Sequence, residues 1–148
     1  MFDYNMILLD GSVDYNAAND TPAISTTRDA ATGAAVIDLG AGTPKGGLVA
    51  CLIIPNDVNG ATDTLTAYLE ASDTADMTGT TTGIERLGSF QKAAATTGVI
   101  LGSEVPCVAF VHFTTKKRYV RLNGTVGTSP DDFGAVKCYL TPFPFGSL

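Results

Sequence analysis

The chain has 148 residues, of which 45% are hydrophobic and 16% are charged, and its formal net charge at pH 7 is −6. This length allows one domain with a hydrophobic core that needs no disulfide bonds. The acidic balance argues against nucleic-acid binding, and no run approaches the ~20 apolar residues of a transmembrane helix. Because a soluble monomer usually has about a quarter charged residues, we expect partners or copies of the chain to cover part of the surface.

Residues 1–33 are predicted to form an extended arm. After the first ten residues the segment is polar and rich in Ala, Thr and Asp, so it has little core of its own. Residues 6–9 are apolar, but this run is too short for a signal peptide and has no basic flank. We therefore expect an arm that is ordered only against a neighbour, a single domain over residues 34–148, and synthesis in a cytoplasm.

Alternating apolar and polar residues predict most of the strands in this domain. Residues 65–72 alternate cleanly, whereas residues 48–54 are apolar on both faces and are predicted to lie centrally in a sheet. Residues 84–91 fit either a short helix or an edge strand, although Gly88 disfavours the helix. Three further strands are predicted at residues 35–39, 99–101 and 133–140. The glycine-rich loop 40–47 is interpreted as a hairpin loop, since no helix follows to make a phosphate site.

The stretch from residue 106 to residue 126 is predicted to form a central hairpin. Residues 106–113 are apolar on both faces apart from His112, which indicates a strand deep in the core. Residues 118–126 place Val120, Leu122 and Val126 on one side and polar residues on the other, as on a half-exposed strand. With about eight short strands, we expect an all-β protein: an antiparallel two-sheet β-sandwich of the jelly-roll type.

No group of residues in the sequence indicates catalysis, a metal site or a cofactor. His112 is the only histidine, and we interpret it as a structural residue within its strand. Cys51, Cys107 and Cys138 match no zinc or redox spacing and are interpreted as buried thiols. We therefore predict that the protein is not an enzyme and binds no small-molecule substrate, nucleic acid or membrane.

Charges are distributed unevenly along the chain. Residues 1–85 contain twelve acidic and two basic residues, a net charge of −10, whereas residues 86–148 contain three acidic and seven basic residues, a net charge of +4. Such halves would suit contacts between subunits. The predicted interface residues are the basic strand residues with their tyrosine and the two phenylalanines of the proline-broken tail: Arg118, Arg121, Tyr119, Phe143 and Phe145.

An ordered set of short motifs resembles the small Bbp16-type cement, or capsid decoration, proteins of tailed bacteriophages. The motifs are VIDLG (36–40), a glycine-rich loop with an apolar strand, LEASD (69–73), LGSF (87–90), VP (105–106), RYVRL (118–122), TVG (125–127) and AxxxYLTP (135–142). The resemblance implies a jelly-roll subunit that binds the outside of an icosahedral head as a homotrimer. It further implies that the protein bridges major capsid proteins and reinforces the shell.

Two alternatives remain open from the sequence. One is a carbohydrate-binding jelly-roll module of a virion head or tail, in which Tyr68 or Tyr119 would serve as the aromatic platform. The other is a small β-sandwich enzyme, which would require His112 to be exposed in a pocket.

Overall fold

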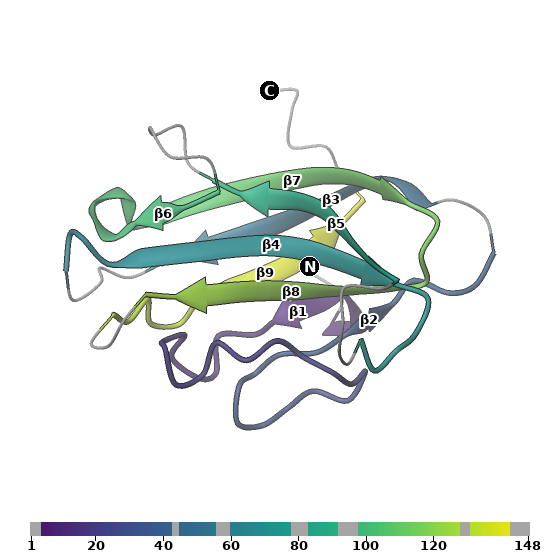
Figure 1. The fold of residues 1–148 in the computed structure, drawn as a ribbon, viewed down its shortest axis with the longest axis horizontal. Helices are drawn as coiled ribbons and strands as arrows, with labels where there is room; N and C mark the ends of the chain where they lie inside the picture. The colour runs from purple at the N-terminus through teal and green to yellow at the C-terminus, as the bar shows by residue number, and fades with distance from the viewer. Residues whose placement is uncertain are drawn as a thin grey trace.

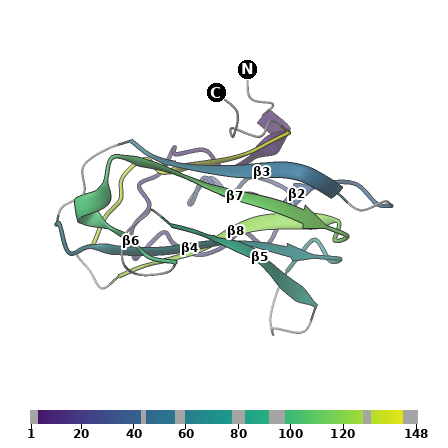
Figure 2. The ribbon, with the colours of Figure 1, turned by 90° about the horizontal axis from the view of Figure 1, so that it is seen from above.

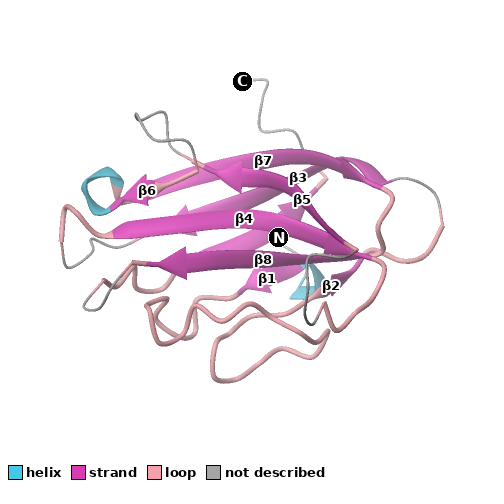
Figure 3. Cartoon of the chain, viewed as in Figure 1, coloured by secondary structure: helices cyan, strands magenta, loops and turns pink. Residues whose placement is uncertain are grey.

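The computed structural model describes residues 4–42, 45–55, 60–77, 83–91, 98–127 and 131–142. Within these ranges the chain is all-β, with nine strands, two single-turn 3₁₀ helices (η1, Tyr4–Met6; η2, Gly102–Glu104) and no α-helix (Figures 1 and 3). None of the described helices is long and apolar enough to cross a bilayer. The prediction of an all-β protein is therefore confirmed.

The strands form two antiparallel sheets that face each other, as Figure 2 shows from above. The first sheet has the order β1 (Ile7–Leu9), β9 (Lys137–Thr141), β3 (Lys45–Ile54), β7 (Cys107–Thr115). The second sheet has the order β2 (Ile37–Asp38), β8 (Tyr119–Val126), β4 (Thr64–Ser72), β5 (Ile84–Phe90), and β6 (Ile100–Leu101) also pairs with β4. This arrangement confirms the predicted two-sheet architecture.

Most consecutive strands lie in opposite sheets. The predicted central hairpin is wrong: β7 pairs with β3 in the first sheet, and β8 pairs with β2 and β4 in the second. The predicted hairpin around loop 40–47 is wrong for the same reason, because β2 and β3 also belong to different sheets. Side-chain periodicity identifies a strand and its faces, but it carries no information on the strand's partner.

The core lies between the sheets and contains the inward residues of both. Leu65, Ala67, Leu69 and Ala71 of β4 are at most 1% exposed, as the alternation predicts. Residues 84–90 form edge strand β5 rather than a helix. A Cβ atom at Gly88 would lie only 2.6 Å from Cγ1 of Val111, so glycine allows β5 to approach β7 closely.

Strand β7 does not lie deep in the core as predicted. Its residues alternate strictly between buried and exposed, because β7 is the edge strand of its sheet and only its inner face is covered. Strand β3, by contrast, lies between β7 and β9 and is covered on both faces, with Val49 and Leu52 each 1% exposed. The prediction for residues 48–54 is therefore confirmed.

The segment of residues 10–34, here called the covering segment, packs against its own chain beside β8 (Figure 1). Tyr15 is 5% exposed; its amide donates to the Gly134 carbonyl at 2.8 Å, and its carbonyl accepts from Phe133. An Asp20 carboxylate oxygen accepts from the Val126 amide at 2.9 Å. The covering segment thus has contacts without any neighbouring molecule, while the proposed boundary at residue 33 stays a prediction.

Alkaline pH is expected to destabilise the fold through Tyr15. Burial, and then the nearby Asp20 charge, raise the pKa of the Tyr15 phenol well above its ordinary value of 10.0. The folded state therefore holds the phenol proton more tightly than the unfolded chain. The stabilisation by the Tyr15 phenol is fully present below pH 10, the ordinary pKa of tyrosine, and is lost as the pH rises further.

Urea unfolding of Tyr15→Phe at pH 8 and pH 11 tests this expectation. The variant should lose less unfolding free energy between the two values than the wild type, and Tyr119→Phe at a half-buried position is the control. Both proteins retain the Cys138 thiol, and burial raises the pKa of this thiol as well. The variant should therefore still lose some unfolding free energy at pH 11. Equal losses in Tyr15→Phe and wild type would contradict the assignment.

Candidate interaction surfaces

Two of the three basic residues before β8, Lys117 and Arg118, are paired within the chain. Arg118 donates through Nε and Nη2 to the two carboxylate oxygens of Asp38 at 2.9 and 2.7 Å, and this hydrogen bond raises the pKa of Arg118. The Lys117 ammonium lies 2.5 Å from an Asp73 carboxylate oxygen. Tyr119 lies beneath Arg118, with the guanidinium carbon 4.9 Å from the ring centroid. These side chains join the start of β8 to β2 and to the end of β4.

Arg121 is buried instead of exposed. Its Nε donates to Glu70 Oε2 at 2.8 Å, and its Nη1 donates to the carbonyl oxygens of Ala23 and Met77, each at 3.1 Å. Arg121 is 6% exposed and Glu70 is 9% exposed. The predicted polar face of β8 is therefore covered here, because the covering segment and residue 77 pack over it. The Arg121 charge is therefore satisfied within the chain, and its place at an interface stays a prediction.

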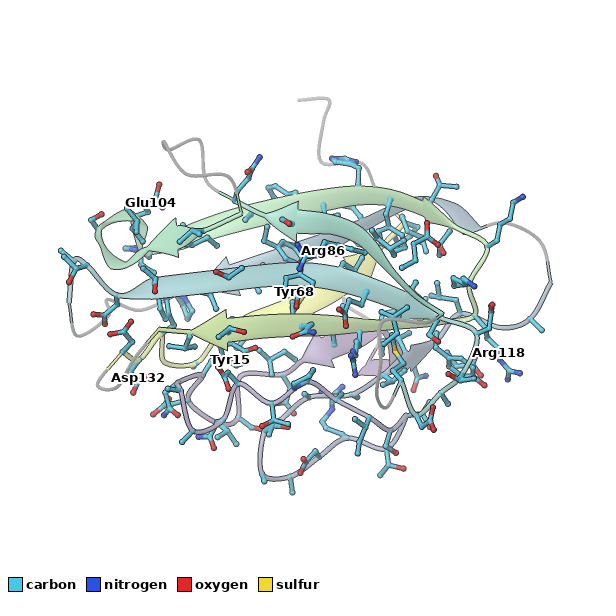
Figure 4. All side chains as sticks on the ribbon, in the orientation of Figure 1. Tyr15, Tyr68, Arg86, Glu104, Arg118 and Asp132 are labelled. Carbon is cyan, nitrogen blue, oxygen red and sulfur yellow. The ribbon has the colours of Figure 1, made fainter. Side chains whose placement is uncertain are left out.

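Arg86 and Tyr68 form a stacked pair on the outward face of the second sheet (Figure 4). The Arg86 guanidinium carbon lies 3.6 Å from the Tyr68 ring centroid, within the range of a strong cation–π contact. Arg86 is exposed and Tyr68 is half-buried. Tyr68 and Tyr119 thus each carry an arginine against the ring, whereas a sugar platform needs an open ring face.

Sequence reasoning treated Tyr68 alone and missed its partner. Arg86 reaches Tyr68 because β4 pairs with β5. This pairing places Ser89 opposite Tyr68 and Arg86 opposite Glu70. A register shift between Leu69 and Glu70 in this pairing was not readable from periodicity.

The outward face of β7 is exposed and uncharged. Val108 is 44% exposed and Phe110 is 42% exposed, and they are two of the three large exposed hydrophobic residues among the described residues. On the outward faces of β7, β9 and residues 49–53 of β3, Lys137 is the only residue with a formal charge. Edge strands of soluble proteins usually carry charges that prevent association, so this surface is suited to contact another molecule.

His112 is exposed on this same face, which corrects its interpretation as a structural residue within the strand. It belongs to the outward set of the alternating β7 residues, which are exposed, whereas the inward set is buried in the core. The imidazole borders a hollow of about 470 Å³ that is also lined by Gly47, Leu48, Phe113, Thr114 and Pro142. These lining residues offer no carboxylate or thiol to assist acid–base catalysis.

The remaining candidates from the sequence are the three cysteines and the two phenylalanines of the tail. Cys51, Cys107 and Cys138 are all buried, as expected for thiols that serve as small hydrophobic residues. Among the described residues, no three His, Cys, Asp or Glu side chains are arranged to hold a metal ion. Phe143 and Phe145, the predicted interface residues of the tail, lie outside the described residues.

No protein-family model, curated protein or solved structure matches the chain significantly.

Removal of Arg121 alone is expected to destabilise the protein strongly. Arg121→Leu leaves the Glu70 carboxylate buried without its cation and frees two carbonyl groups, which should lower the free energy of unfolding by about 3–5 kcal/mol. The double variant Arg121→Leu/Glu70→Leu should recover part of this loss, because no unpaired charge remains. Urea unfolding measures both changes.

Arg118→Leu is the matched control, since it removes an exposed arginine–aspartate pair from the start of the same strand. Its effect should be much smaller than that of Arg121→Leu. Similar losses for the two single variants would show that burial of the Arg121 pair has no special importance.

Proposed function

We propose that the protein is a bacteriophage capsid decoration protein, which binds the exterior of an icosahedral head as a homotrimer and stabilises the shell by bridging major capsid proteins. The observation that carries the proposal is the uncharged outward face of edge strand β7, with Val108 and Phe110 exposed. The motif resemblance supports a phage capsid as the assembly in which such a surface would be covered.

The outward face of β7 would be a liability to a monomer in solution. A nine-residue edge strand with no outward charge favours association, so its retention is best explained by a partner. Burial contributes about 25 cal/mol per Å² of apolar surface, so one such contact is modest. On a repeating capsid lattice, however, several modest contacts per trimer combine through avidity. A capsid decoration protein would bind through several such contacts on a repeating lattice.

We also propose that the sandwich is a jelly roll. The supporting observation is the nesting of its antiparallel pairs: β1 with β9, β2 with β8, β3 with β7, and β4 with β5. Apart from the short β6, the first strand pairs with the last, the second with the one before it, and so on inward. A long hairpin rolled into two sheets has this order, which is typical of jelly rolls.

The first test is the copy number of the chain in purified phage particles from its source, by quantitative mass spectrometry against the major capsid protein. We expect a copy number comparable to that of the capsid protein. A few copies per particle would indicate a tail or vertex component, and absence from particles would contradict the proposal.

The outward face of β7 is expected to contribute to capsid binding. The double variant Val108→Ser/Phe110→Ser should weaken binding to capsids that lack the protein by about tenfold or more, because it removes apolar area at the contact. Co-sedimentation over a range of concentrations measures the affinity.

Ile24→Ser is the matched control, since Ile24 is 56% exposed but lies in the covering segment instead of on β7. This variant should bind like the wild type. Equal affinities for wild type and the double variant would remove β7 from the binding surface.

A further inference from the structure

Val49 and Cys51 of β3 are buried although their side chains point away from the core. Their exposed fractions are 1% and 4%. The alternate residues of β3, Ala50, Leu52 and Ile54, belong to the core between the sheets, so Val49 and Cys51 belong to the outward set. Outward side chains of a sheet with an open face keep part of their surface in solvent, so this burial requires a cover over β3.

The burial ends before β7. The strand register places Val49 between Thr141 of β9 and His112 of β7. Cys51 is likewise flanked on its β7 side by Phe110. Thr141 is 5% exposed, whereas His112 and Phe110 belong to the exposed residues. The cover therefore lies over β3 and the end of β9.

The chain leaves β9 beside these residues. Pro142 is the last residue of this part of the chain that the structure describes, and it borders the hollow next to His112 and Leu48. Residues 143–148, here called the C-terminal segment, follow it. Adjacent strands lie about 4.8 Å apart and six extended residues span up to about 20 Å, so the C-terminal segment is long enough to cross β3.

The composition of the C-terminal segment suits such a cover. Pro142 and Pro144 have no amide N–H, so the chain cannot continue β9 as a regular strand between two neighbours. Phe143 and Phe145 are two positions apart, and both rings therefore face the same side of an extended chain. The C-terminal segment also has no charged side chain, which matches the uncharged sheet face next to it.

We propose that the C-terminal segment folds back across the outward face of the first sheet of its own chain, where Phe143 and Phe145 cover Val49 and Cys51. This inference goes beyond the proposed function and does not depend on it, so absence of the chain from phage particles would not contradict it.

Residues 1–3 are the other part of the chain that could supply this cover. They are joined to η1 and β1, and β1 is separated from β3 by β9 in the sheet order. The C-terminal segment starts closer, because β9 pairs directly with β3. With the C-terminal segment over β3, the exposed Val108 and Phe110 of β7 stay available to a partner.

Thiol reactivity tests the cover, because Cys51 should lie beneath it while Cys107 and Cys138 belong to the core. In the folded double variant Phe143→Ser/Phe145→Ser, N-ethylmaleimide should alkylate Cys51 at least tenfold faster than in the wild type, as measured by peptide mass spectrometry. Cys107 and Cys138 should keep their wild-type rates. Faster reaction of all three thiols would show that the variant has unfolded, and the trapping experiment below then decides.

Phe2→Ser is the matched control, since it removes a phenylalanine from residues 1–3. Cys51 should react in this variant as in the wild type. An unchanged Cys51 rate in the folded double variant, or a faster rate in Phe2→Ser, would overturn the proposal. Loss of Cys51 protection when the wild type is diluted would also overturn it, because the cover would then come from a second copy.

Disulfide trapping locates the C-terminal segment without removing both rings. Phe143→Cys and Phe145→Cys are oxidised mildly as separate single variants, and at least one should form a disulfide with Cys51 within the same chain. Ile24→Cys, at an exposed position of the covering segment, should form none with Cys51. Disulfides that form only between chains, or no disulfide in either variant, would overturn the proposal.

Discussion

The buried pair of Arg121 and Glu70 is the constraint on which the outer side of the second sheet depends. A buried guanidinium is stable only when its donors are satisfied, and here three groups satisfy it: the Glu70 carboxylate and the carbonyls of Ala23 and Met77. These acceptors come from β4, the covering segment and the chain beyond β4. One side chain of β8 therefore holds together segments that are distant in the sequence.

At Met77, one of the Arg121 acceptors, the backbone adopts an uncommon conformation. It has a φ of 40°, a left-handed conformation that is uncommon for residues other than glycine, while its side chain is 2% exposed and its carbonyl accepts from Arg121. Burial of the side chain and the hydrogen bond to the arginine together offset the backbone cost. The same packing covers the polar face of β8 that would otherwise be in contact with solvent.

The two sheets consequently differ in their outward surfaces. The second sheet is partly covered by its own chain, and its charged residues there are paired, apart from the stacked Arg86. The first sheet has a largely uncharged outer face that ends at edge strand β7. A protein whose second sheet is partly covered by its own chain, and whose first sheet has Val108 and Phe110 exposed at its edge, is suited to bind a surface, which agrees with the proposed role on a capsid.

The all-β class, the two-sided burial of residues 48–54 and the alternation over residues 65–72 could be predicted from the amino-acid sequence, because side-chain periodicity is a local property of a strand. Burial of the three cysteines also followed from their apolar surroundings. The sheet that each strand joins, the edge position of β7 and the burial of Arg121 became known only from the folded chain. These outcomes depend on partners far along the chain, such as Ala23, which is 98 positions from the arginine it contacts. The energy of such contacts is set by packing and desolvation in the folded molecule, and a local pattern contains neither.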